Sequence, residues 1–149
     1  MDRRQDKQLR LPAGRLLLSV VAAILLLNGI TRAAETGKPT RLCVVWTSGD
    51  PEVAKNVCFM YTGNAKKQGW FDEVHLVVWG PSAKLLAGNQ ELQAAVQTMQ
   101  QAGVVTEACI NCARNYGVVE ALQGLKIDVK PMGVPLSERL QADWKVLTF

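Results

Sequence analysis

The sequence predicts a three-layer α/β/α sandwich with a mostly parallel five-stranded sheet. Two observations lead to this fold class. Apolar runs typical of strands alternate along the chain with segments of helical spacing, and this alternation is typical of parallel sheets that helices cover on both faces. The first run, Leu42–Thr47, is also continuously apolar, as expected of a strand that is buried on both sides.

The N-terminal segment has the three-part pattern of a secretory signal. Five basic side chains lie within the first 15 residues. An apolar core of about 15 residues and a run of small residues follow, and a membrane-spanning helix usually needs about 20 apolar residues. We therefore expect a signal peptide over 1–33, a flexible lead-in over 34–40 and one domain over 41–149. The mature domain would be exported, to the periplasm or the exterior, and an uncleaved anchor is the weaker alternative.

The charge of the chain is concentrated in this first segment. The full chain has 17 basic and 13 acidic residues. Cleavage after Ala33 would remove six basic and two acidic residues, so that the mature domain of about 116 residues is formally neutral. Nucleic-acid binding needs a basic patch on the folded domain, and the sequence shows no such cluster. We expect no nucleic-acid partner, and membrane contact only through the signal segment.

The first strand is expected to lead into a long helix. Asp50 suits the N-cap, and Pro51 suits the first turn. The helical pattern continues to about Lys67, and Gly69 ends it. Four apolar residues at helical spacing are expected to face the core: Val53, Val57, Met60 and Tyr61.

The remaining elements follow from the same signals, with glycine and proline between them. In order, we expect a strand over 73–79, a short helix over 83–87, a helix over 90–102, a strand over 104–109, a helix over 109–116, a helical turn over 118–122, a strand over 126–130, a helix over 135–142 and a strand over 145–149. The helix over 90–102 should bury Leu92, Val96 and Met99.

Ligands of parallel sheets bind beyond the carboxyl ends of the strands. The segments that follow four of the expected strands should meet at this edge. They supply the candidate pocket residues Ser48, Gly49, Asp50, Gly80, Pro81, Ser82, Asn111, Met132 and Gly133. Some of these have a structural alternative, because Asp50 and Ser82 suit helix caps and Gly80 and Gly133 suit tight turns.

The strongest chemical signal is the segment Ala108-Cys109-Ile110-Asn111-Cys112-Ala113. Cys109 is expected at a strand-to-helix junction, where unpaired backbone N–H groups and the helix dipole favour an anion. Such an environment lowers the pKa of a thiol. We therefore expect Cys109 to be the nucleophile and Cys112, one turn later, to be the resolving thiol. A structural disulfide between the two is the alternative, since disulfides persist in exported proteins.

Other uses of these cysteines fit less well. A thioredoxin-type motif normally follows an early strand, whereas this pair follows the third. A zinc site needs about four ligands, and the pair supplies two. Cys43 and Cys58 lack short ligand spacing, so we expect them to be small buried hydrophobic residues, with a second bridge between them left open. We expect neither a metal nor a cofactor.

The sequence also argues against a cysteine–histidine dyad. His75, the only histidine, lies near the start of the second expected strand, whereas Cys109 ends the third. The two residues should then lie at opposite edges of the sheet, roughly 15 Å apart along the strands. We expect His75 to be a structural residue near the surface.

Taken together in order, several segments give the chain a family resemblance. They are Thr47-Ser48-Gly49-Asp50, residues 80–86, residues 108–113 running into Tyr116-Gly117-Val118, residues 132–136 and residues 146–149. Over 41–149 the chain resembles the DsrE/DsrF-like family of small sulfur-relay proteins. This resemblance implies a DsrEFH-like α/β/α fold, frequent homo- or hetero-oligomers, and a persulfide on the cysteine after the third strand, which Cys109 matches. Cys112 resembles the second cysteine of a subgroup with a Cys-x-x-Cys pair.

Export separates this chain from the relay members that act in the cytoplasm and from their partners there. Two hypotheses follow. In the first, the chain is an exported thiol protein that uses Cys109, with Cys112 resolving, to carry persulfide sulfur or to exchange thiols. In the second, it is a non-enzymatic ligand- or protein-binding module in which Cys109 and Cys112 form a structural disulfide. No complete set of catalytic residues is visible in the sequence, and neither a sulfur donor nor a sulfur acceptor can be identified from it. Whether the chain is an enzyme is therefore left open.

Overall fold

The computed structural model describes residues 38–149, so the expected signal peptide and most of the expected lead-in lie outside the described residues. Five strands form one sheet in the order β4-β3-β2-β1-β5, and each neighbouring pair is parallel. The strands are β1 (Arg41–Trp46), β2 (Glu73–Val78), β3 (Val105–Cys109), β4 (Asp128–Lys130) and β5 (Trp144–Thr148). The predicted sheet is confirmed, and all of its pairings are parallel.

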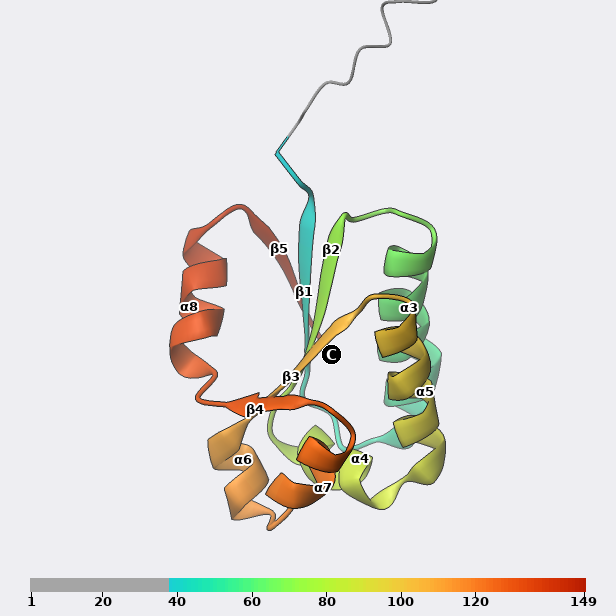
Figure 1. Cartoon of the computed structure of the whole chain (residues 1–149), viewed down its shortest axis with the longest axis vertical. Helices are drawn as coiled ribbons and strands as arrows, with labels where there is room; N and C mark the ends of the chain where they lie inside the picture. Colours follow the sequence, from blue (N-terminus) through green and yellow to red (C-terminus); the bar gives the residue numbers. More distant parts are fainter. Residues whose placement is uncertain (1–37) are drawn as a thin grey trace, which may run out of the picture. The chain divides into compact units, whose positions relative to one another are not determined.

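Helical segments connect the strands (Figure 1). They are α2 (Pro51–Val53), the π-helical η1 (Ala54–Phe59), α3 (Met60–Lys67), α4 (Pro81–Gly88), α5 (Gln90–Gln101), α6 (Ile110–Asn115), α7 (Val119–Gly124) and α8 (Gly133–Gln141). Within residues 38–149, none of these helices is both long enough and apolar enough to cross a membrane.

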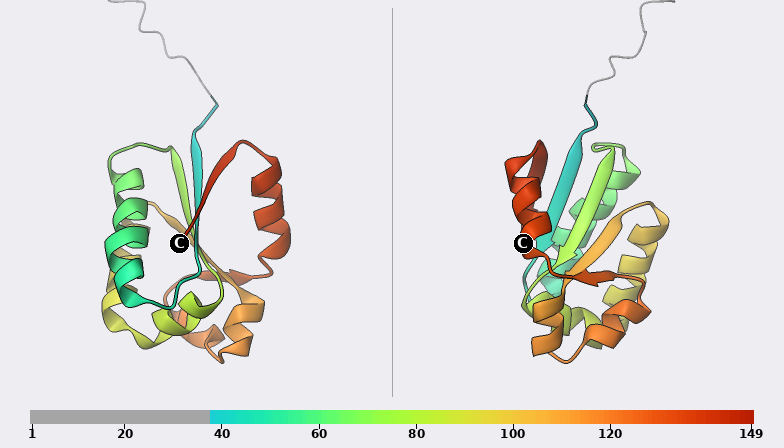
Figure 2. Two further views of the ribbon diagram at one scale, coloured as in Figure 1. Left: turned by 180° about the vertical axis from the view of Figure 1, so that it is seen from behind. Right: turned by 60° about the vertical axis from the view of Figure 1, so that its left-hand side comes forward.

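Helices cover both faces of the sheet, which gives the predicted three layers (Figure 2). The segments η1, α3 and α5 cover one face, where the main apolar cluster includes Leu42 and Val44 of β1. The opposite face carries α6 and α8. A smaller apolar cluster lies there, formed by Cys43, Val45, Val77, Cys109 and Met132.

The position of α8 follows from the strand order. The chain moves from β1 through β2 and β3 to β4 in one direction and then returns to place β5 on the other side of β1. Crossovers between parallel strands are right-handed. When the direction of travel reverses, the connecting helix must therefore lie on the opposite face. This places α8, the connection between β4 and β5, on the face opposite to η1, α3 and α5.

The first helix differs from the prediction. Its N-cap is as expected, since the Asp50 carboxylate accepts the backbone N–H of Glu52 at 2.8 Å. A π-helical stretch, η1, then interrupts it, and wider turns shift the phase of the side chains. As a result Val57 and Met60 are exposed, and the buried residues of η1 are Ala54, Cys58 and Phe59. The prediction for α5 is confirmed, because Leu92, Val96 and Met99 are buried.

The carboxyl ends of the strands meet at one edge of the sheet. Val78, the last residue of β2, pairs with Trp46 at the end of β1 and with Ala108 near the end of β3. Cys109 pairs with Lys130, the last residue of β4. The segments that follow these strands are therefore neighbours, as the sequence predicts for the candidate site.

Candidate functional site

The cysteine pair lies at this carboxyl edge. Cys109 is the last residue of β3 and the N-cap of α6, with an extended backbone at φ −70° and ψ 115°. Cys112 lies in the first turn of α6. The predicted strand-to-helix junction is thus present. The two cysteines differ in access to solvent, because Cys109 is only 5% exposed whereas Cys112 is half-buried.

The two thiols influence each other. Burial raises the pKa of the Cys112 thiol above its ordinary value. The backbone N–H of Gly80 opposes this rise, while a hydrogen bond with Cys109 and the charge of Cys109 add to it. A negative charge on Cys109 therefore favours the protonated form of Cys112. The raised pKa keeps the Cys112 thiol protonated at neutral pH.

The candidate residues after β1 and β2 divide into two groups. Gly49 and Pro81 line a surface groove and pack tightly, because a Cβ on Gly49 would lie 3.3 Å from the Cβ of Pro81. Ser82 is buried instead. Its hydroxyl donates to the Trp46 carbonyl at 2.6 Å and accepts the N–H of Trp79 at 3.1 Å. Ser82 therefore ties β1 to β2 beneath the edge.

Two other residues of these loops have local backbone roles. The Ser48 hydroxyl accepts the N–H of Asp50 at 3.1 Å, and Asp50 itself caps the first helix. Gly80 is the N-cap of α4 and has φ +74°, a conformation that favours glycine. The turn at Gly80 brings its backbone N–H to Cys112.

The candidate residues that follow β3 and β4 also differ in burial and packing. Asn111 is exposed on α6. Met132 is buried, and it packs in the same small cluster as Cys109. Gly133 is exposed and begins α8. The edge therefore brings Met132 to Cys109 on one side of the pair and Gly80 to Cys112 on the other.

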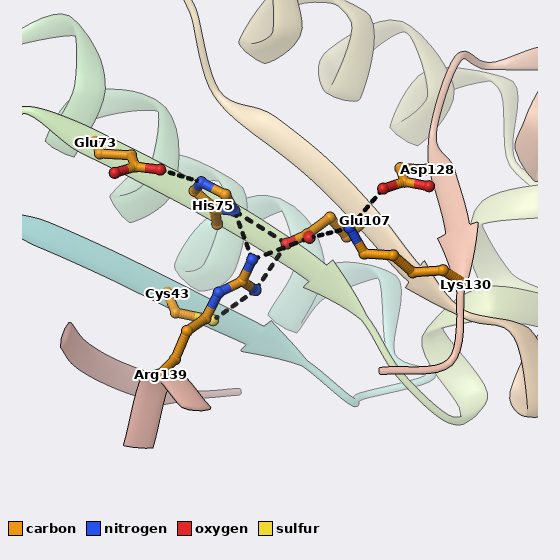
Figure 3. A network of polar contacts seen from close by, with 7 residues as sticks. All are labelled: Cys43, Glu73, His75, Glu107, Asp128, Lys130 and Arg139. Carbon is orange, nitrogen blue, oxygen red and sulfur yellow. Dashed lines mark hydrogen bonds and ion pairs between the residues drawn. The ribbon is translucent and has the colours of Figure 1, made fainter. Parts of the chain in front are cut away.

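A buried ionic network, which the sequence did not reveal, joins β2, β3 and β4 to α8 (Figure 3). It lies on the same sheet face as Cys109, because residues two apart on a strand point to the same side. Its centre is Glu107, two residues before Cys109 on β3 and only 2% exposed. Arg139 of α8 binds this carboxylate with both terminal nitrogens, at 2.7 and 2.9 Å. Lys130 of β4 lies 2.8 Å from it, and His75 Nδ1 lies 3.0 Å from it.

The network sets the ionisation of Glu107. Burial works against the charged form, but hydrogen bonds from His75, Arg139 and Lys130 outweigh it and hold the pKa of Glu107 far below its usual range. Glu107 is thus an anion at every physiological pH. It joins three strands to α8, whose residues are otherwise at most half-buried.

His75 differs from the sequence interpretation. We expected it near the surface, whereas it is 8% exposed. Its Nε2 lies 2.7 Å from Glu73, and its Nδ1 lies 3.0 Å from both Glu107 and Arg139. His75 pairs with Val105, four residues before Cys109, which separates them by roughly 13 Å along the strands. The argument against a Cys–His dyad therefore agrees with the strand register.

The other two cysteines lie on opposite faces of the sheet. Cys43 packs under α8, where Arg139 Nη1 lies 3.8 Å from its sulfur, and Cys58 packs in the main cluster on the other face. The second bridge that the sequence left open is excluded by this arrangement. Burial raises the pKa of the Cys58 thiol to about 12, against an opposing hydrogen bond from Thr62. Within residues 38–149, no three His, Cys, Asp or Glu side chains gather to hold a metal ion.

Comparison with known proteins agrees with this geometry. The model of the DsrE/DsrF-like family matches residues 41–149. The chain belongs to the DsrE/DsrF-like family. Among solved structures, a conserved protein of unknown function from Bacteroides thetaiotaomicron is similar, with a TM-score of 0.71 and 35% identity over 73% of this chain and 94% of that one. No curated protein matches this chain.

Membership of the DsrE/DsrF-like family indicates a sulfur-relay or thiol-related role at the level of the family. The cysteine pair is the part of this chain that suits such a role. The two cysteines lie close together, at the edge of the sheet where parallel α/β domains bind ligands.

Proposed function

We propose that the chain is an exported thiol protein that carries sulfane sulfur as a persulfide on Cys109, with Cys112 as the resolving thiol. One observation carries this proposal. Cys109 ends β3 and caps α6, and Cys112 lies in the first turn of that helix, within reach of the Cys109 sulfur. The family-level thiol role supports the proposal, as does the raised pKa of Cys112, which keeps the second thiol protonated.

The loading step balances without an oxidant. The Cys109 thiolate attacks the outer sulfur of a small persulfide, R–S–SH. A bond forms between the Cys109 sulfur and that outer sulfur, and the bond between the two donor sulfurs breaks. The electron pair leaves with the organic thiolate, R–S⁻, and the proton stays on the transferred sulfur.

The resolving step is also balanced. The Cys112 thiolate attacks the Cys109 sulfur of the persulfide, which forms the Cys109–Cys112 disulfide and releases HS⁻. Because its pKa is raised, Cys112 resolves slowly at neutral pH and faster in alkali. A persulfide on Cys109 would therefore persist long enough to meet an acceptor.

Mass spectrometry of the reduced protein after treatment with a small persulfide tests the proposal. We expect wild type and Cys112→Ser to gain one sulfur atom, mapped to Cys109, and Cys109→Ser to gain none. Cys58→Ala should load like wild type, because Cys58 lies on the other face of the sheet. Alkaline treatment of the loaded protein should release sulfide from wild type and not from Cys112→Ser.

The rival function, a binding module with a structural disulfide, makes different predictions. It requires that neither wild type nor Cys112→Ser gains sulfur. It also requires that Cys109→Ser and Cys112→Ser lower the melting temperature by similar amounts. These two results together would contradict the persulfide proposal.

Export and assembly are separate parts of the proposal. The signal-like segment over 1–33 supports export, and the family resemblance supports a homo-oligomer. N-terminal sequencing of the protein from an intact host tests the first, with a mature terminus near residue 34 expected. Light scattering during gel filtration tests the second. An unprocessed N-terminus or a monomeric mass would contradict the corresponding part.

A further inference from the structure

A surface groove lies at the same edge of the sheet as the cysteine pair, and nothing in the proposed chemistry so far uses it. Its volume is about 580 Å³, within the range of ligand pockets. Its walls come from the loop after β1, from α4 and the residue after it, and from the end of α6. The lining residues are Gly49, Pro81, Lys84, Leu85, Gly88, Asn89 and Tyr116.

Cys112 does not itself line the groove, but two segments that line the groove also contact Cys112. The N–H of Gly80 interacts with the Cys112 sulfur, and the next residue, Pro81, lines the groove. On the other side, the N–H of Tyr116 donates to the Cys112 carbonyl at 3.1 Å, and Tyr116 also lines the groove. The two segments that contact Cys112 are therefore the two that form this end of the groove.

The polar groups of the groove favour an anion. Lys84 is the only charged residue of the lining, and it makes no ion pair with any residue between 38 and 149. Asn89 uses its carbonyl oxygen to accept the N–H of Leu92 at 3.1 Å, which leaves its NH₂ group as a donor. No carboxylate lines the groove, while Pro81 and Leu85 add apolar surface.

We propose that this groove binds the organic part of a small carboxylate-bearing thiol, delivered as its persulfide, and that Lys84 pairs with the carboxylate. This inference rests on the proposed function, because it names the class of sulfur donor that the cysteine pair uses. The thiol end of the donor lies toward the cysteines, and its carboxylate lies toward Lys84. The released thiolate, R–S⁻, then leaves along the groove.

Two matched donors test this specificity: glutathione persulfide and the persulfide of glutathione diethyl ester, which lacks free carboxylates. The rate of sulfur gain is measured by mass spectrometry for wild type, Lys84→Ala, Lys84→Glu and Lys67→Ala. We expect Lys84→Ala to slow loading from glutathione persulfide about fivefold, the upper end for an exposed ion pair, and Lys84→Glu to slow it further. Loading from the ester should not change in Lys84→Ala.

Lys67 is the matched control, because it is an exposed lysine at the end of α3, before β2 and so at the other edge of the sheet. Lys67→Ala should load from both donors as wild type does. Equal rates for wild type and Lys84→Ala with glutathione persulfide would overturn the inference. So would an equal loss with both donors, which would indicate a structural effect.

Binding separates this inference from the persulfide proposal. Amide chemical shifts of the Cys109→Ser/Cys112→Ser protein are measured on titration with reduced glutathione. Shifts confined to residues of the groove and removed by Lys84→Glu support the groove even if no variant takes up sulfur, in which case only the persulfide proposal fails. No shifts at the groove would overturn the inference even if the cysteines load normally.

Discussion

Replacing Glu107 by glutamine should destabilise the domain strongly. The Glu107 side chain is 3% exposed and binds Arg139 with both oxygens, and the Arg139 side chain is itself only 11% exposed. Glutamine keeps the shape and removes the charge, so the guanidinium stays buried without a counter-ion. Removing one partner of a buried ion pair costs about 3–5 kcal/mol.

We expect the lower end of this range. Lys130 keeps Asp128 as a partner, and its side chain is 35% exposed, so it turns to solvent at little cost. A loss of about 3 kcal/mol corresponds to a fall in melting temperature of about 12 °C for a domain of this size. Thermal unfolding followed by circular dichroism at pH 7 measures the fall directly.

A second variant shows whether the lost charge is the cause. Glu107→Gln/Arg139→Met replaces both members of the pair by neutral side chains, and such replacements are often close to neutral. The double variant should therefore recover most of the stability that the single variant loses. A fall of less than about 3 °C in the single variant, or a double variant no more stable than the single one, would refute the reasoning.

The pH dependence of the unfolding free energy gives an independent check that the Glu107 charge stabilises the fold. The folded-state pKa of Glu107 lies below that of the unfolded chain, so its charge stabilises the fold fully above the unfolded-state pKa of about 4.3 and this contribution is lost as the pH falls further. The difference in unfolding free energy between wild type and Glu107→Gln should narrow as the pH falls below about 4. Urea unfolding at several pH values measures it, and a difference that widens in acid would contradict the assignment.

Two further predictions concern single side chains. Ser82→Ala should lower the unfolding free energy by about 1–3 kcal/mol in urea titrations, because it leaves the Trp79 N–H and the Trp46 carbonyl with one partner fewer; an unchanged midpoint would show that the hydroxyl contributes nothing. Iodoacetamide should modify Cys112 in the folded protein at a rate that rises into the alkaline range. It should modify Cys58 only when the protein unfolds, because burial raises the pKa of Cys58 to about 12. Fast labelling of Cys58 under native conditions, located by peptide mass mapping, would contradict this expectation.

Much of the fold follows from local pattern in the sequence. The apolar run that ends at Cys109 and the helical pattern that begins with Ile110 are both visible along the chain, so the junction that positions the cysteine pair could be predicted. The face of α5 could also be predicted, because Leu92, Val96 and Met99 keep regular helical spacing. These features depend on neighbours in the sequence.

The features that could not be predicted depend on distant partners. Glu107 is a single acidic residue in an apolar strand, and only the docking of α8 shows that Arg139, 32 residues later, is its partner. The signal that was available was the charge itself, since a glutamate in a buried strand requires a cation. The π-helical η1 moved Val57 and Met60 to the surface, and the spacing of apolar residues cannot register such a change of phase.

The sheet also divides the four thiols into two compartments. Cys58 lies on one side, and Cys43, Cys109 and Cys112 lie toward the other. Cys43 and Cys109 are two strands and four residues apart, roughly 16 Å, well beyond the separation of about 7 Å that a disulfide spans. In an oxidising compartment the unfolded chain can form several wrong disulfides, whereas the folded sheet allows only the pair at the start of α6. In such a compartment, wrong disulfides could therefore form only before the sheet is complete, because the folded sheet keeps the other cysteines apart.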